Sequence, residues 1–142
     1  MSLKRLIIVA LSVLMLASLA VGQSNSQMYK EAQRIFQSYR YQVDYSDFQL
    51  KTYDEGGQKI LQLLVIVKSG RNRFDEALLV SFAACGAAIK ASNTDVDRVS
   101  VVVKVQYKDE VSIAATADAA DVKGLYTESM DVGTFMGRLT WH

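Results

Sequence analysis

Residues 47–70 read DFQLKTYDEGGQKILQLLVIVKSG and set the expected fold, because two strand-like runs flank the pair Gly56-Gly57. Glycine adopts positive φ angles without strain, so two glycines suit the tight turn of a β-hairpin. When the two runs are paired residue by residue outward from this turn, the apolar side chains of both strands lie on one face of the hairpin. The facing pairs are then Glu55 with Gln58, Leu50 with Leu63, and Phe48 with Val65. The second run ends as LLVIV, which is typical of a central strand.

A second hairpin is predicted over residues 97–117, DRVSVVVKVQYKDEVSIAATA. The valines at alternate positions from Val99 to Val105 indicate a strand with one apolar face. If residues 108–110 form the loop, Val111 and Ile113 continue that face on the returning strand.

The first helix is expected within residues 26–41, SQMYKEAQRIFQSYRY, which carry one apolar stripe at helical spacing. The stripe consists of Met28, Ala32, Ile35, Phe36 and Tyr39. From Tyr39 to Tyr45 every second residue is apolar or aromatic, which indicates a short strand after this helix.

Two further helical regions follow the hairpins. Residues 68–93 predict a long helix with Asn72 as its N-cap. Residues 118–142 predict one broken helix or two short ones, with Asp118 and Asp131 as N-caps.

The expected element order is helix, two strands, helix, two strands, helix. Two antiparallel hairpins with helices to one side make a two-layer α+β sandwich, so we predict an antiparallel sheet covered by helices on one face. This order is similar to that of type III secretion chaperones and of the YbjN-like domains. The resemblance is one of topology, and it implies a fold without implying a function.

The N-terminus predicts export. MSLKR supplies a basic start, residues 6–21 are apolar, and small residues at Ser18, Ala20 and Gly22 suit a signal peptidase. We therefore expect residues 1–22 to be a signal peptide and residues 23–142 to be a single domain in the periplasm or outside the cell. The alternative is an uncleaved membrane anchor, although this 16-residue segment falls short of the ~20 residues that span a bilayer comfortably.

Composition limits the partners that can be expected. The 142 residues are 50% hydrophobic and 22% charged, as in globular proteins, and the formal net charge is +1. Loss of Lys4 and Arg5 with the signal peptide changes this charge to −1. Such a balance has no basic excess for nucleic acid or for an anionic membrane, so neither is expected to bind the mature chain.

The stretch SFAACGAAIKAS, residues 81–92, contains the single cysteine, Cys85. One cysteine forms no internal disulfide. A nucleophilic thiol needs a nearby base or an electropositive setting, and this apolar segment offers neither. We interpret Ala84, Cys85, Gly86 and Ala88 as a strip of small residues that lets the helix pack closely.

Aromatic and basic residues are the candidate binding groups. Tyrosines cluster between residues 29 and 53, and Tyr41, Tyr45 and Tyr53 are the candidates for a partner surface. Lys68, Arg71 and Arg73 precede a predicted helix N-terminus, where an anion can be bound. The alternatives are tyrosines that cover the core and a solvated basic loop.

Metal and histidine chemistry has little support. Asn93, Asp95 and Asp97 alternate like the opening of a calcium loop, but Arg98 stands where that loop needs glycine. The alternative is a polar connection in which Asn93 is a left-handed helix cap. His142 is the only histidine and ends the chain, so neither a Cys–His dyad nor a zinc site is expected.

We therefore expect a small exported domain without enzymatic activity or cofactor, which binds a protein partner or a second copy of itself as a homodimer. Two alternatives remain open. One is a ligand-binding or hydrolytic domain with a pocket between sheet and helices. The other is a membrane-tethered accessory subunit or secretion-chaperone-like module.

Overall fold

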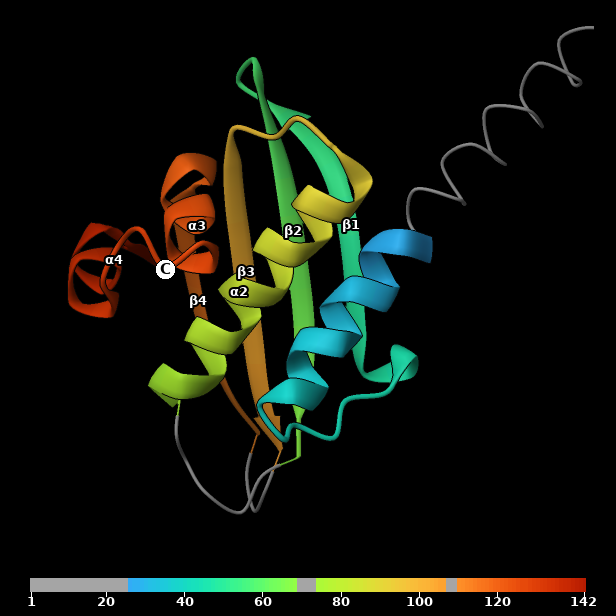
Figure 1. Ribbon diagram of the computed structural model, residues 1–142. Coiled ribbons are helices and arrows are strands. Elements are labelled where there is room, and N and C mark those ends of the chain that lie inside the picture. The colour runs from blue at the N-terminus through green and yellow to red at the C-terminus, as the bar shows by residue number, and fades with distance from the viewer. Residues whose placement is uncertain (1–25, 69–73, 107–109) are drawn as a thin grey trace, which may run out of the picture.

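The computed structural model of the chain describes residues 26–68, 74–106 and 110–142 (Figure 1). The predicted signal peptide, the predicted cap Asn72, and Arg71 and Arg73 lie outside these ranges. A helix at residues 26–38 comes first. The later elements are η1 (Tyr45–Asp47), β1 (Phe48–Glu55), β2 (Gln58–Val67), α2 (Phe74–Ser92), β3 (Arg98–Gln106), β4 (Glu110–Asp118), α3 (Ala119–Tyr126), α4 (Val132–Arg138) and β5 (Thr140–Trp141).

The described residues form an α+β fold around one five-stranded sheet of order β1-β2-β3-β4-β5. The prediction of a fully antiparallel sheet is wrong, because β2 and β3 run parallel while the other neighbours are antiparallel. The reason is the connection between the two hairpins. The 19-residue α2 carries the chain back along the sheet by about 28 Å, so β3 starts at the same end as β2.

Both predicted hairpins are confirmed. The first has the predicted register, with Glu55 opposite Gln58 and Phe48 opposite Val65. Gly56 and Gly57 both have positive φ, at 59° and 77°, as the turn requires. In the second hairpin Val111 and Ile113 lie opposite Val105 and Val103, so they continue the predicted face. The predicted loop bound is wrong, because Glu110 begins β4 and pairs with Gln106.

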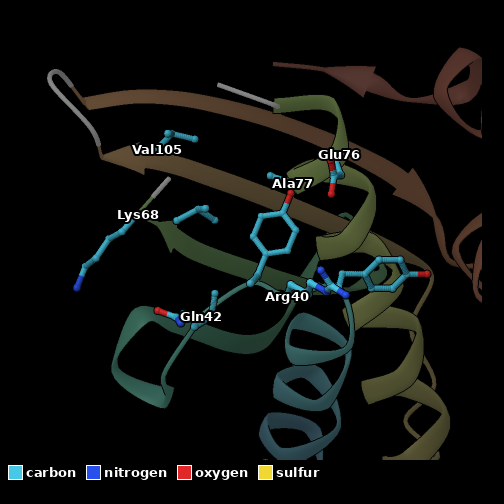
Figure 2. A pocket seen from close by; sticks show the side chains of 10 residues that line it. Arg40, Gln42, Lys68, Glu76, Ala77 and Val105 are labelled. Carbon is cyan, nitrogen blue, oxygen red and sulfur yellow. The ribbon is translucent and has the colours of Figure 1, made fainter. Parts of the chain in front are cut away.

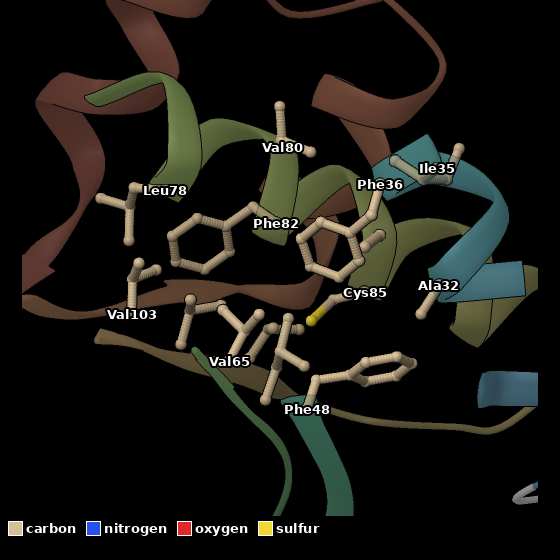
Figure 3. Close-up of a cluster of buried hydrophobic side chains, with 14 of the residues drawn as sticks. Ala32, Ile35, Phe36, Phe48, Val65, Leu78, Val80, Phe82, Cys85 and Val103 are labelled. Atoms are coloured by element: carbon tan, nitrogen blue, oxygen red, sulfur yellow. The ribbon is translucent and has the colours of Figure 1, made fainter. Parts of the chain in front are cut away.

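The hydrophobic core lies between one face of the sheet and the helices. In β2 and β3 the odd-numbered residues from Leu61 to Val67 and from Val99 to Val105 are buried. Figure 1 shows the first helix and α2 lying across the same side of the strands. Figure 3 shows Ala32 and Phe36 of the first helix meeting α2 and the strands within this core.

The α2 segment packs closely, as its small residues predict. Ala84, Cys85 and Ala88 are fully buried. A Cβ added at Gly86 would lie 2.8 Å from the Tyr126 Cβ and 3.5 Å from Val122, both in α3. Gly86 is therefore the point at which α3 approaches α2, and the strip lies inside the domain.

Two local predictions near residue 39 are wrong. Tyr39 is 55% exposed, although the apolar stripe placed it in the core. The helical residues end at 38 and Arg40 has φ of 64°, so helical spacing no longer applies at Tyr39. The expected strand at residues 39–45 is replaced by an irregular segment and the short η1.

The C-terminal region contains two short helices, which is one of the two predicted arrangements, and one strand that was not predicted. The Asp131 side chain caps α4 by accepting a hydrogen bond from the Thr134 backbone N–H at 3.1 Å. Asp118 occupies the N-cap position of α3 without a side-chain capping bond. After α4 the chain turns into β5, which pairs with β4 at Ala115 and Thr116.

Candidate functional site

The face of the sheet opposite the core is incompletely covered. Leu64 of β2, Val102 of β3 and Ala114 of β4 lie side by side in register on this face, and all three are partly exposed. We call it the open face. Its other side chains are largely polar or charged, among them Gln49, Lys51, Gln62, Ser100, Lys104 and Thr116. An apolar centre within a polar surround is the composition of a protein-binding surface.

A groove of about 450 Å³ occupies one end of the open face. It is lined by residues of all five strands, including Tyr53, Arg98 and Val102. Arg98 lies 3.7 Å from the Asp118 carboxylate, and among the described residues its buried Nε has no hydrogen-bond partner. Tyr53 is one of the predicted binding residues, and it lines this groove.

His142 is held in the same groove. Its backbone N–H donates to the Ala114 carbonyl oxygen at 2.9 Å, which extends the β4–β5 pairing by one residue. Its imidazole Nε2 lies 2.8 Å from the Thr116 hydroxyl oxygen, and this hydroxyl donates to Ser100 at 3.5 Å. The groove thus presents a connected row of hydroxyl and imidazole groups to solvent.

This row can hydrogen-bond a polar partner. A histidine base is normally oriented by a third group, most often a carboxylate. Within the described residues, no carboxylate hydrogen-bonds to His142. Cys85 lies in the core on the opposite side of the sheet, so the structure does not bring these two residues together.

The burial of Cys85 explains why its thiol is expected to be unreactive. The side chain is fully buried, and Figure 3 shows its sulfur pointing into the apolar cluster. Desolvation in this setting raises the pKa of the Cys85 thiol far above its ordinary value. The thiol therefore stays protonated at neutral pH, which removes its nucleophilic form.

A second pocket, of about 300 Å³, lies at the carboxyl ends of β2 and β3 beside the start of α2. In sheets with parallel strands, ligands commonly bind at this end. Figure 2 shows Lys68 and Glu76 on opposite sides of the pocket, with Arg40 and Gln42 also against it. Charges of both signs at its mouth suit a small polar ligand better than a simple anion.

The predicted binding residues that the structure describes do not all lie together. Tyr41 and Lys68 line the pocket beside α2, and the Lys68 ammonium also lies 3.7 Å from the Asp47 carboxylate. Tyr45 is 52% exposed, with its ring 6.3 Å from that of Tyr29 and 6.1 Å from that of Phe48. Tyr53 lies in the groove of the open face. Arg71 and Arg73 lie outside the described residues.

The Asn93–Asp97 segment has a structural role at the sheet. Asn93 has φ of 51° directly after α2, as predicted for a left-handed cap. The Asp97 carboxylate accepts from the Lys59 backbone N–H at 2.8 Å, and the Asp97 backbone N–H donates to the Lys59 carbonyl oxygen. Asp97 therefore ties the approach to β3 onto β2. Within the described ranges, no three His, Cys, Asp or Glu side chains converge as a metal site would require, and this includes Asp95.

The groove residues Thr116 and His142 were not predicted as a pair. The β3–β4 register alone sets Thr116 opposite Ser100, so the hydroxyl pair was within reach of sequence reasoning. The addition of His142 depends on β5, a two-residue strand too short to produce an alternating pattern.

The chain matches no protein-family model, and neither curated proteins nor solved structures include a significant match. In the part of the chain that the structure describes, no helix is both long and apolar enough to cross a membrane.

Proposed function

We propose that this chain is an exported, non-enzymatic binding domain that associates through the open face with a second copy of itself. The observation that supports this is the row of Leu64, Val102 and Ala114, which leaves apolar side chains partly exposed at the centre of a sheet face. In this proposal the helices and the sheet form two layers of a sandwich, and the second copy supplies a further layer over the sheet.

The size of the open face suits such a pair. Four strands spaced ~4.8 Å apart, each rising ~3.3 Å per residue, give a face of roughly 500 Å² per copy. Two copies would then bury on the order of 1,000 Å², which is where specific interfaces begin. One patch that serves both copies is compatible with a two-fold pair, and a net charge near zero leaves two copies with little mutual repulsion.

The oligomeric state tests the proposal directly. Size-exclusion chromatography with light scattering should give a dimer for the unaltered protein and a monomer for Val102→Lys, because the lysine places an unpaired charge in the centre of the interface. Val111→Lys is the matched control, since Val111 lies on the other face of the sheet and is 49% exposed. A monomeric parent protein, or a dimer that Val102→Lys leaves intact, contradicts the proposal.

The export part of the proposal rests on the apolar segment at residues 6–21. The intact mass of protein recovered from an exporting host should correspond to a chain that starts near Val21 or Gln23. A mass that retains Met1, together with a need for detergent, would instead favour the membrane-tethered accessory subunit.

A second candidate function is the binding of a small polar ligand in the pocket beside α2. The position of this pocket at the carboxyl ends of two parallel strands favours it. Ligand addition should then shift the backbone amide NMR signals of Gln42 and Ala77, while those of the open face stay unchanged. Shifts confined to the open face would exclude this pocket as the site.

A further inference from the structure

A third hollow, which we call the α2–α4 groove, lies between α2 and the chain that joins α3 to α4. Its volume is about 590 Å³, within the range of sites that bind a ligand or the side chains of a partner. Leu79, Val80 and Ala83 of α2 form one wall. Leu125, Met130 and Val132 contribute to the other, so both walls carry apolar side chains.

The second wall is fixed by backbone hydrogen bonds. The N–H groups of Ser129 and Met130 both donate to the Gly124 carbonyl oxygen, at 2.9 and 3.1 Å. Glu128 adopts a positive φ of 61°, which turns the chain sharply after α3. The groove is therefore preformed, and a partner would not have to order this connection on binding.

Two exposed hydrophobic side chains also line the α2–α4 groove. Tyr39, 55% exposed, and Val132, 50% exposed, both line it. They are two of the five most exposed large hydrophobic side chains in the described part of the chain. Surface of this kind at a concave site is typical of protein interaction sites.

The charged side chains that line the α2–α4 groove indicate what charge a bound partner would carry. Among the described residues, the charged side chains that line the groove are Glu76, Glu128 and Asp131, and all are acidic. Arg40 follows Tyr39 in sequence but lines the neighbouring pocket. Hydrogen bonds from Thr134 lower the pKa of Asp131, so this carboxylate stays ionised over a wide pH range.

We propose that the α2–α4 groove binds a cationic, apolar peptide segment of a partner protein. Apolar side chains of the segment would fill the space between Leu79 and Val132, and its lysine or arginine side chains would face Glu128 and Asp131. The flexible Met130 side chain adapts to apolar groups of different shape. This proposal does not rest on self-association, because the groove shares no lining residue with the groove of the open face.

A labelled synthetic peptide of leucine and lysine, with leucine at helical i, i+3, i+4 and i+7 spacing, is the probe, and fluorescence anisotropy is the measurement. Val132→Ser should weaken binding about fivefold by removing apolar contact. Glu128→Gln with Asp131→Asn should weaken it about tenfold at low salt and reduce its salt dependence. Asparagine is an equally good N-cap, so this variant keeps α4 folded.

Matched controls locate the binding. Val111→Ser removes an equally exposed valine outside the groove, and Asp54→Asn with Asp95→Asn removes two exposed charges elsewhere. Neither control should change the affinity. The proposal is overturned if the control variants weaken binding as much as the groove variants, or if a leucine–glutamate peptide binds as tightly as the leucine–lysine peptide. It is also overturned if the leucine–lysine peptide does not bind.

Discussion

The Tyr29 hydroxyl group binds both backbone groups of Leu50. The Leu50 N–H donates to the hydroxyl oxygen at 2.9 Å, and the hydroxyl donates to the Leu50 carbonyl oxygen at 3.5 Å. Strand β1 is an edge strand, and the unpaired backbone groups of an edge invite pairing with another chain. A side chain of the first helix therefore occupies the edge of the sheet at Leu50, and self-association through this edge is disfavoured there.

Tyr29→Phe should lower the free energy of unfolding by about 1 kcal/mol, because the Leu50 backbone loses its partner while the ring contact with Phe48 at 5.1 Å is kept. Urea unfolding measures the change. Tyr45→Phe is the control, since Tyr45 is 52% exposed and should tolerate the loss of its hydroxyl group. Equal effects of the two substitutions would show that the edge contact contributes nothing.

Gly86→Ala should destabilise the protein by about 1–3 kcal/mol, because its new Cβ would lie 2.8 Å from the Tyr126 Cβ and would push α3 away from α2. Gly137→Ala is the opposite case. Gly137 lies in α4, and a Cβ there meets no atom within 4 Å, so the substitution should stabilise the protein by up to about 1 kcal/mol. Thermal unfolding of both variants tests this contrast, and a neutral Gly86→Ala would mean that the helices separate freely.

The raised pKa of Cys85 predicts a dependence of stability on pH. The folded chain keeps the thiol proton at pH values where the unfolded chain loses it, above about 8.5. The contribution of the Cys85 thiol to the free energy of unfolding is therefore fully present below that pH. Above it, this contribution falls by up to about 1.4 kcal/mol per pH unit. Urea unfolding at several alkaline pH values should show a shallower decline for Cys85→Ala than for the parent protein. Parallel declines would contradict the assignment.

Iodoacetamide provides an independent test of Cys85 burial. The native protein should resist alkylation at neutral pH, whereas the protein in urea should gain one adduct by mass spectrometry. Rapid alkylation of the native state would mean that the thiol is accessible.

The ion pair between Arg138 and Asp121 should matter more than its surface position suggests. Arg138 Nη1 lies 3.0 Å from the Asp121 carboxylate, whose side chain is only 12% exposed, and the pair joins α4 to α3. Arg138→Leu leaves this carboxylate unpaired and should cost about 1–3 kcal/mol. Arg34→Leu breaks the more exposed pair with Glu31 and should cost less than about 0.5 kcal/mol. A larger loss for Arg34→Leu in denaturant unfolding would contradict this ranking.

The candidate binding residues were the least predictable part of the protein. Tyr41, Tyr45 and Tyr53 were expected either to form a partner surface or to cover the core. Their positions relative to one another depend on how the chain turns between them. The positive φ of Arg40 ends the first helix, and the irregular segment after it separates Tyr41 from Tyr45. Alternation along β1 then places Tyr53 on the open face. Alternation was therefore enough to set the face of Tyr53, but no sequence pattern specified where Tyr41 and Tyr45 would lie.

The sequence by itself determined the two hairpins, the register of the first hairpin and most of the helices. The turn at Gly56-Gly57 and the alternation of apolar residues fixed the first hairpin pair by pair, because a shift of one residue would move every apolar side chain to the wrong face. The small residues around Cys85 likewise specified a closely packed helix. These features depend on neighbours in the chain, so the local pattern carries the information.

Only the tertiary structure decided how these elements meet. The parallel pairing of β2 with β3 follows from the path of α2 across the sheet, and the pairing of β5 with β4 from backbone hydrogen bonds that any residues could make. The same long-range packing brings His142 to Thr116 and sets Met130 opposite α2. Backbone pairing and packing between distant segments leave little trace in a single sequence, because many side chains satisfy them equally well.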